Sequence, residues 1–171
     1  VTIKLPSSVF SLPTLPSDEF PSLESNDNYQ LFSINAAILL SLFERTRHAI
    51  SNEEIRYYLN GVYLHTTTEG DDKYLIAAAT DGHRLAKIKA LVTSEVPDID
   101  GIIVHKKTIS EVIKLLEESP NDITFGISNN KIMFKNDNHT IISKVVDGKF
   151  PDYNKAIPQD NDKTLIASLP D

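Results

Sequence analysis

The sequence contains the same order of predicted elements twice: a short strand, a helix, and then three or more strands. The first unit has a strand at residues 31–34 and a helix over residues 35–48. The second unit has a strand at residues 101–104 and a helix that begins at Thr108. The helices begin about 72 residues apart, which is too long for a solenoid repeat and fits an internally duplicated domain. We therefore predict an α+β domain in which two helices pack side by side on one face of antiparallel sheets.

Both helices are predicted from apolar side chains that recur three and four residues apart, which places them on one helical face. Those positions are Leu39, Leu42 and Phe43, with Thr46 continuing the spacing, in the first helix and Ile109, Val112, Ile113 and Leu116 in the second. Thr108 and Glu111 also have the spacing of a capping box, in which each side chain accepts from the other's backbone amide. We therefore expect Thr108 to cap the second helix.

The strands after each helix are predicted from β-branched and aromatic runs that turn residues separate. They cover residues 55–59, 62–68, 73–80 and 84–89 in the first unit and residues 123–127, 131–134 and 140–146 in the second. Asn60-Gly61 is the pair typical of a type I′ turn, so a tight hairpin is expected there. Each unit therefore ends in an antiparallel meander.

The two ends of the chain differ from this pattern. Four of the nine prolines lie in the first 21 residues, and each removes a backbone donor and disfavours helix before it. Residues 1–23 are therefore predicted to be an extended linker, with at most an edge strand at residues 1–5. Near the other end, residues 164–167 are predicted to begin a new strand.

Composition excludes several classes of protein. The chain has 17 basic and 24 acidic residues, a net charge of −7, so any contact with nucleic acid must use a local basic patch rather than a global field. Cysteine is absent, which excludes disulfides, cysteine-ligated zinc and thiol nucleophiles. No apolar run is long enough to span a membrane, and no secretory signal is visible. We expect a soluble, cytoplasmic protein.

Asp81 and His83 stand two residues apart in one turn and could belong to a hydrolase or to a metal site. The structural alternative is an ordinary tight turn, because Asp-Gly is a standard turn pair and no third ligand has a recognisable spacing. No glycine-rich phosphate loop and no dinucleotide fingerprint is present in the sequence. The turn is favoured, and we expect no catalytic residue, metal or cofactor.

Basic residues gather around both predicted helices although the chain is acidic. They are Arg45, Arg47, His48, Lys106, Lys107 and Lys114. If the helices lie side by side, these side chains could face a polyanion. Solvated helix faces with local partners such as Glu111, Glu117 and Glu118 explain the same residues equally well.

Three motifs occur in order along the chain: RYYLNG at residues 56–61, ATDGHRLA at residues 79–86 and VDGKFPDY at residues 146–153. Together they closely resemble the bacterial DNA sliding clamp, the β subunit of DNA polymerase III. The opening segment, FSLPTLPSDEFP at residues 10–21, is similar to the end of that family's first domain. The resemblance implies the DNA-clamp fold over nearly the whole chain.

The resemblance also implies a division into domains and a role. Residues 1–27 correspond to the end of the first clamp domain and a linker, residues 28–158 to the complete central domain, and residues 159–171 to the start of the third domain. In this family two three-domain chains form a homodimeric ring around duplex DNA and keep the polymerase on it. The helices line the hole, so the six basic residues named above would face phosphates, and the subunit itself is not catalytic.

A second implication concerns partners. The family binds short peptides of the DNA polymerase III catalytic subunit, the clamp loader and repair proteins in a pocket between its second and third domains. The matching residues here are Arg56, Leu59, Thr80, Gly82, His83, Arg84, Leu85, Pro151, Lys155 and Ala156. Lys155 replaces a frequent Arg, and Ala156 replaces a larger aliphatic residue. The alternative is a truncated, free-standing interaction module that forms no ring.

Overall fold

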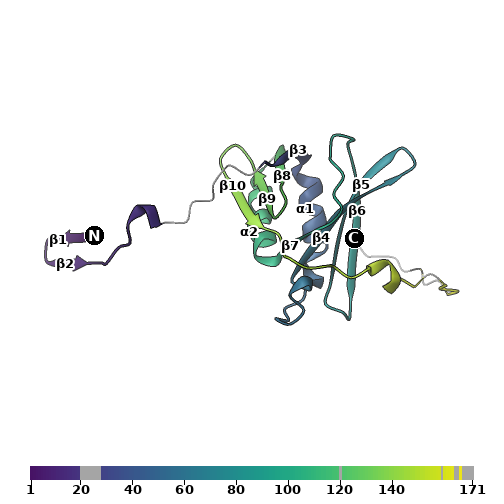
Figure 1. Ribbon diagram of the computed structural model, residues 1–171, viewed down its shortest axis with the longest axis horizontal. Helices are drawn as coiled ribbons and strands as arrows, with labels where there is room; N and C mark the ends of the chain where they lie inside the picture. Colours follow the sequence, from purple (N-terminus) through teal and green to yellow (C-terminus); the bar gives the residue numbers. More distant parts are fainter. Residues whose placement is uncertain (20–27, 120, 159, 164–165, 167–171) are drawn as a thin grey trace.

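The computed structural model describes residues 1–19, 28–119, 121–158, 160–163 and 166. Its body contains two α-helices and two four-stranded antiparallel sheets (Figure 1). The first unit comprises β3 (Gln30–Asn35), α1 (Ala36–Glu44), β4 (Gly61–Glu69), β5 (Asp72–Thr80) and β6 (Leu85–Val92). The second comprises β7 (Ile102–His105), α2 (Lys106–Glu117), β8 (Asp122–Ile127), β9 (Lys131–Lys135) and β10 (Thr140–Lys144). The duplicated α+β pattern is confirmed.

The two units exchange their first strands. One sheet has the order β10-β9-β8-β3 and the other the order β6-β5-β4-β7, so the strand before each helix pairs with the meander of the other unit. Phe32 of β3 is opposite Phe125 of β8, and Val62 of β4 is opposite Val104 of β7. Each helix therefore connects the two sheets, and neither unit is complete without the other.

The larger of two hydrophobic clusters joins the helices and both sheets. It contains Leu39 and Phe43 of α1, Ile109 and Val112 of α2, and buried residues of every strand from β3 to β5 and from β7 to β9. Aromatic rings fill the side under the second meander, where Phe125 and Phe134 stack with centroids 4.7 Å apart. Helices α1 and α2 pack against each other, as the sequence predicts.

Helix α1 is shorter than predicted, because it ends at Glu44 and not at His48. The buried Thr46 hydroxyl donates to the carbonyl oxygens of Leu42, at 2.7 Å, and Phe43, at 3.3 Å. The helix ends here, so its last carbonyls need partners from outside it, and the Phe43 carbonyl also accepts from the Thr46 backbone N–H at 3.2 Å. The side chain thus satisfies the end of the helix, and a short 3₁₀ turn, Arg47–Ala49, follows.

The capping box predicted at Thr108 is wrong. His105 is the N-cap residue of α2, and its Nδ1 accepts from the backbone N–H of Lys107 at 3.2 Å. Thr108 lies inside the first turn, where its hydroxyl bonds to that of Ser143 at 2.7 Å. The helix therefore begins two residues earlier than its apolar periodicity indicates.

The hairpin predicted at Asn60-Gly61 is also wrong. Tyr57–Leu59 forms a 3₁₀ turn instead of a strand, and Gly61 has no positive φ. A glycine is needed at this position because a Cβ atom would collide with the Val104 carbonyl of the neighbouring β7. The true hairpin turn of β4 and β5 contains Gly70, whose φ is +64°.

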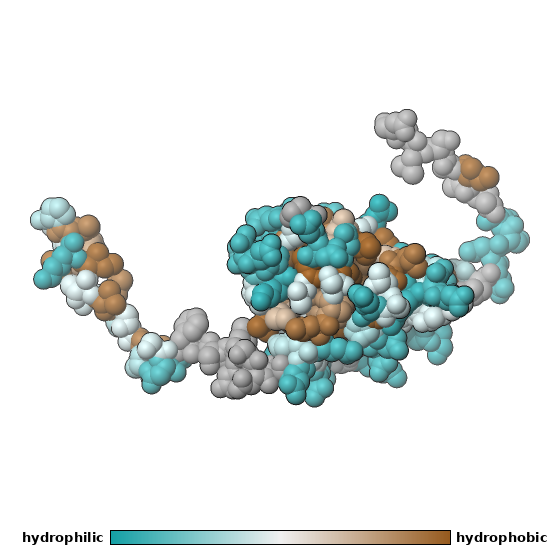
Figure 2. Space-filling view, turned by 90° about the horizontal axis from the view of Figure 1, so that it is seen from above, coloured by the Kyte–Doolittle hydropathy of each residue, from teal (hydrophilic) through white to brown (hydrophobic). Residues whose placement is uncertain are grey.

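The N-terminal segment contains more structure than the predicted edge strand. β1 (Thr2–Leu5) and β2 (Ser8–Ser11) form a two-stranded hairpin, and a 3₁₀ turn, Ser17–Glu19, follows. Every described residue up to Glu19 is exposed, and Figure 2 shows this hairpin, with its apolar side chains, standing apart from the body. The strand predicted at residues 164–167 lies almost entirely outside the described residues. Within the part of the chain that the structure describes, no helix is long and apolar enough to cross a membrane.

Candidate functional site

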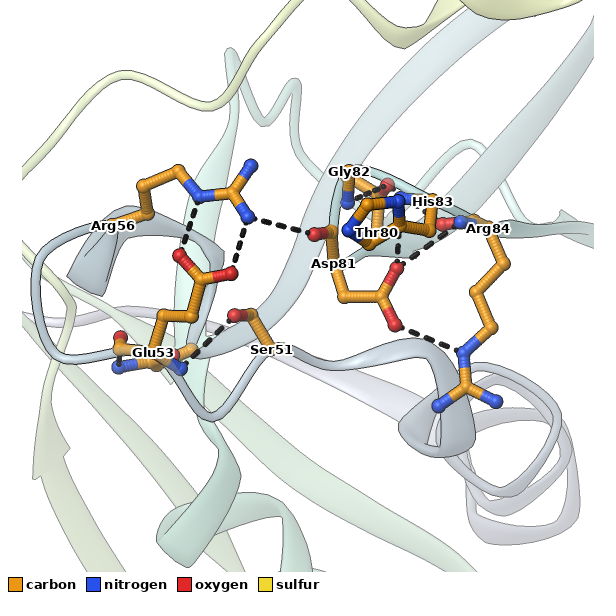
Figure 3. A network of polar contacts seen from close by, with 9 residues as sticks. Ser51, Glu53, Arg56, Thr80, Asp81, Gly82, His83 and Arg84 are labelled. Carbon is orange, nitrogen blue, oxygen red and sulfur yellow. Dashed lines mark hydrogen bonds and ion pairs between the residues drawn. The ribbon is translucent and has the colours of Figure 1, made fainter.

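The turn between β5 and β6 is organised by the side chain of Asp81. Its Oδ1 accepts from the backbone N–H groups of His83, at 3.0 Å, and Arg84, at 3.1 Å, and its Oδ2 accepts from Arg84 Nε at 3.0 Å (Figure 3). These bonds, the two backbone amides first, lower the pKa of Asp81 to about 2. Thr80 closes the turn, since its hydroxyl donates to the Arg84 carbonyl at 2.7 Å. The Asp81 carboxylate thus stabilises the turn.

Arg56 ties the preceding segment to this turn. Its guanidinium binds the Glu53 carboxylate through two nitrogens, and Nη2 also donates to the Asp81 carbonyl at 3.1 Å (Figure 3). Gly82 has a φ of +92°, and a Cβ atom there would meet the Arg56 guanidinium. The motif residues 56–61 and 79–86, far apart in the sequence, are therefore in direct contact.

The third motif reaches the same region through a second apolar cluster. Leu59 and Leu85 belong to a cluster with Phe150 and Tyr153. Tyr153 is the first residue of a 3₁₀ turn, Tyr153–Ala156. Tyr63 stacks on Phe150 with ring centroids 4.8 Å apart. The three segments predicted to share one patch thus converge.

Two further side chains hold the third motif in place. His65 Nε2 lies 2.7 Å from the Tyr153 hydroxyl, and Lys87 lies over the Tyr153 ring at 5.1 Å. Burial, opposed in part by a bond to the Thr66 carbonyl, lowers the pKa of His65. Sequence analysis did not identify His65 as a site residue, because nothing in the sequence of a strand shows which aromatic ring a histidine will contact after folding.

The remaining pocket residues are placed as follows. Leu59 is only 3% exposed, so it supports the patch from beneath, whereas Pro151, Lys155 and Ala156 are exposed. Lys155 lies 3.5 Å from the Asp152 carboxylate. That these side chains form a peptide-binding pocket stays a prediction.

The basic residues around the helices separate into two groups. Arg47, His48 and Lys106 line one small cavity, together with Arg84 from the Asp81 turn. Lys114 is instead held by the Glu111 carboxylate at 3.0 and 3.1 Å, and Arg45 and Lys107 are exposed outside this cavity. The sequence assigned Arg84 to a different surface from the other three, so their meeting was missed.

The hydrolase interpretation of Asp81 and His83 finds no support in this geometry. The Asp81 carboxylate bonds to the backbone amide of His83 rather than to its imidazole. In the described ranges, no group of three His, Cys, Asp or Glu side chains could hold a metal ion. The Asp81 carboxylate bonds to His83 and Arg84 within the turn, as the turn interpretation requires.

Comparison with known proteins agrees with the motifs. The family profile of the DNA polymerase III beta subunit, central domain, matches residues 33–152. The chain belongs to the sliding clamp family. The beta sliding clamp of Caulobacter vibrioides strain NA1000 is 41% identical over 96% of the chain and 44% of the relative. That of Vibrio cholerae is 34% identical over 96% of the chain and 44% of the relative.

Solved clamp structures share the fold. A crystal structure of the Caulobacter crescentus beta sliding clamp with bound PEG superposes with a TM-score of 0.83 at 41% identity, over 94% of this chain and 43% of that clamp. A clamp from Bartonella birtlesii bound to griselimycin gives a TM-score of 0.80 at 40% identity, over 94% of this chain and 43% of that clamp. The chain thus has the clamp fold and spans less than half the length of these clamps.

Proposed function

We propose that this chain supplies the central domain of a bacterial DNA sliding clamp, together with the end of the first domain and the start of the third. In this role it is a non-catalytic, cytoplasmic processivity subunit that encircles duplex DNA as part of a homodimeric ring. The observation that carries the proposal is the superposition on the C. crescentus clamp over 94% of the chain, with a TM-score of 0.83. The family match over residues 33–152 supports the same assignment.

The DNA-facing part of the proposal rests on the paired helices. Basic side chains lie at the end of α1, in the 3₁₀ turn after it and at the start of α2. Contacts of this kind bind phosphates without reading bases, and their affinity falls steeply with salt. Such binding suits a protein that slides along DNA while the closed ring prevents its release.

The peptide-binding part of the proposal rests on the convergence of the three motifs. The exposed Pro151 and the part-buried Leu85 offer apolar surface, and Arg56 and Arg84 frame it with charge. A mixed apolar and charged lining of this kind is typical of ligand pockets. The related Bartonella clamp binds griselimycin, which makes that compound a suitable probe here. By the resemblance, the partners are the polymerase III catalytic subunit, the clamp loader and repair proteins.

Fluorescence anisotropy with labelled griselimycin tests the pocket. We expect Leu85→Asp to weaken binding by at least about tenfold, a loss of roughly 1.4 kcal/mol, because a carboxylate would replace an apolar contact. Lys107→Glu is the matched control, because it also changes charge but lies on the first turn of α2. Equal binding of griselimycin by the wild type, Leu85→Asp and Lys107→Glu would contradict the pocket assignment. A loss of binding in Lys107→Glu alone would contradict it as well.

A further inference from the structure

One tyrosine anchors the 3₁₀ turn that carries two of the expected pocket residues. Tyr153 is the only buried residue of this turn, with 5% of its surface exposed. Lys155 and Ala156 lie in the same turn, and Pro151 lies two residues before it; all three are exposed. The place of these exposed residues on the body therefore depends on the side chains that Tyr153 contacts.

The segment that contains Tyr153 crosses the sheet of β4, β5, β6 and β7 (Figure 1). Tyr153 shares an apolar cluster with Ala78 of β5 and Leu85 of β6. Strand β5 lies between β4 and β6, so the two flanking strands can each offer a polar side chain to the tyrosine. They do so through His65 of β4 and Lys87 of β6.

His65 binds the hydroxyl of Tyr153 in a defined tautomer. Its Nε2 lies 2.7 Å from that hydroxyl, and its Nδ1 lies 3.2 Å from the Thr66 carbonyl oxygen. Burial lowers the pKa of His65, so the imidazole is neutral at neutral pH. Because a carbonyl oxygen only accepts, Nδ1 carries the ring hydrogen and Nε2 is left as an acceptor. The Tyr153 hydroxyl therefore donates to His65.

Lys87 holds the ring of the same tyrosine. Its Nζ lies 5.1 Å from the centroid of the Tyr153 ring, a distance at which a cation is attracted to an aromatic face. The same Nζ lies 3.5 Å from the Asn154 amide oxygen in the 3₁₀ turn. Strand β6 thus supplies the pocket residue Leu85 and also the lysine that fixes the neighbouring turn.

We propose that His65 and Lys87 are positioning residues of the peptide-binding pocket. By holding Tyr153, they fix where the exposed residues of the 3₁₀ turn lie relative to Leu85, and neither of them touches the peptide. The inference rests on the proposed function and deepens it. A turn that is in its binding position for only part of the time lowers the apparent affinity for a peptide by that fraction. Loss of the Tyr153 contacts therefore weakens binding without changing the pocket surface.

The test measures binding of labelled griselimycin to the whole chain by fluorescence anisotropy. Tyr153→Phe removes only the hydroxyl, and His65→Leu removes its acceptor. We expect each variant to weaken binding about fivefold, the scale of one hydrogen bond. The double variant should be no weaker than either single one, because both changes break the same contact. His65→Gln, whose amide oxygen can accept from the hydroxyl, should restore the affinity to within about twofold of the wild type.

The same sheet supplies a matched control. Lys89 of β6 lies over the ring of Tyr74 of β5 at 4.3 Å, which repeats the contact of Lys87 with Tyr153, but neither residue belongs to the apolar cluster at the 3₁₀ turn. Lys87→Met should weaken griselimycin binding about threefold, whereas Lys89→Met and Tyr74→Phe should change it by less than about 1.5-fold. An equal loss in the control variants would overturn the proposal.

Amide NMR shifts of the free chain give a readout that needs no ligand. His65→Leu should shift the amides of Lys155 and Ala156, and His65→Gln should shift them less. Unmoved amides in His65→Leu would overturn the positioning role.

The failure of this proposal differs from the failure of the pocket itself. If Leu85→Asp weakens griselimycin binding but Tyr153→Phe and His65→Leu do not, the positioning role is wrong and the pocket stands. If Tyr153→Phe lowers the melting temperature and leaves the affinity unchanged, its contact with His65 serves stability alone. If the wild type does not bind griselimycin, the proposed pocket is wrong and the positioning role falls with it.

Discussion

Asp81 shows how a residue that looks catalytic can be structural. Its carboxylate accepts two backbone N–H groups and the Nε of Arg84, and these bonds lower its pKa to about 2. A general base needs a pKa near the working pH, so Asp81 is poorly suited to abstract a proton. Its role is to fix the turn that presents His83 and Arg84.

His65 is the residue for which the structure makes a pH-dependent prediction. Burial lowers its pKa, the Thr66 carbonyl opposes that effect, and the Lys87 charge adds to it. The unfolded state therefore binds the proton more tightly than the folded state. The contribution of His65 to stability is complete above the unfolded pKa of about 6.5 and is lost as the pH falls below it.

We predict that the melting temperature of the wild type falls more between pH 7.5 and pH 5.5 than that of His65→Gln, which cannot titrate. His105, whose pKa burial also lowers, is present in both proteins and cancels in the comparison. His139→Gln is the control, since His139 is exposed. Identical pH profiles for the wild type and His65→Gln would contradict the prediction.

At the scale of elements, the sequence predicts the order of helices and strands well and their boundaries and partners less well. Periodicity finds α1, α2 and both meanders, because apolar spacing reports which face is buried. It cannot show that β3 pairs with β8 and not with β4, since pairing across the chain depends on tertiary packing. Local rules also failed at Asn60-Gly61, where Gly61 is required by the close approach of β7 and not by a turn.

The candidate site was predictable to a similar extent. The resemblance assigns Arg56, Gly82 and Pro151 to one pocket, and in the structure the segments that contain them lie together. The contributions of Glu53 and His65 depend on side chains that meet only after folding. For the same reason, sequence alone could not show that Arg84 and Lys106 share one cavity.

The hydroxyl of Thr46 is predicted to stabilise the C-terminal end of α1. Its hydroxyl is completely buried and serves two carbonyls of α1. Thr46→Val keeps the shape of the side chain but leaves these groups without that donor, so we expect a loss of about 1–2 kcal/mol of unfolding free energy. Urea denaturation measures it. Thr68→Val is the control, because Thr68 is an exposed strand residue, and it should change the free energy of unfolding by less than about 0.5 kcal/mol. An equal effect in both variants would contradict the role of the Thr46 hydroxyl at the end of α1.

At the scale of the whole molecule, the N-terminal hairpin and the body are energetically separate. The hairpin bonds to itself, as when Leu12 N–H donates to the Val1 carbonyl at 2.8 Å. Its apolar side chains stay open to water, with Leu5 54% and Val9 66% exposed. Among the residues that the structure describes, neither buried cluster contains one before Phe32. Two-stranded hairpins without a packed face are marginal in water.

We therefore predict that chymotrypsin cuts first after Phe10, which is 53% exposed on the unpacked hairpin. Tyr57 in the body is equally exposed, but its 3₁₀ turn is anchored by the buried Leu59. Mass spectrometry of timed digests identifies the site. A variant that begins at residue 28 should melt within about 2 °C of the whole chain, because all of residues 1–19 are exposed. A drop of more than about 5 °C, or protection of the hairpin equal to that of α2, would mean that the hairpin packs on the body in solution. The truncated chain should also keep its affinity for duplex DNA, since none of the basic residues at the helices precedes residue 28.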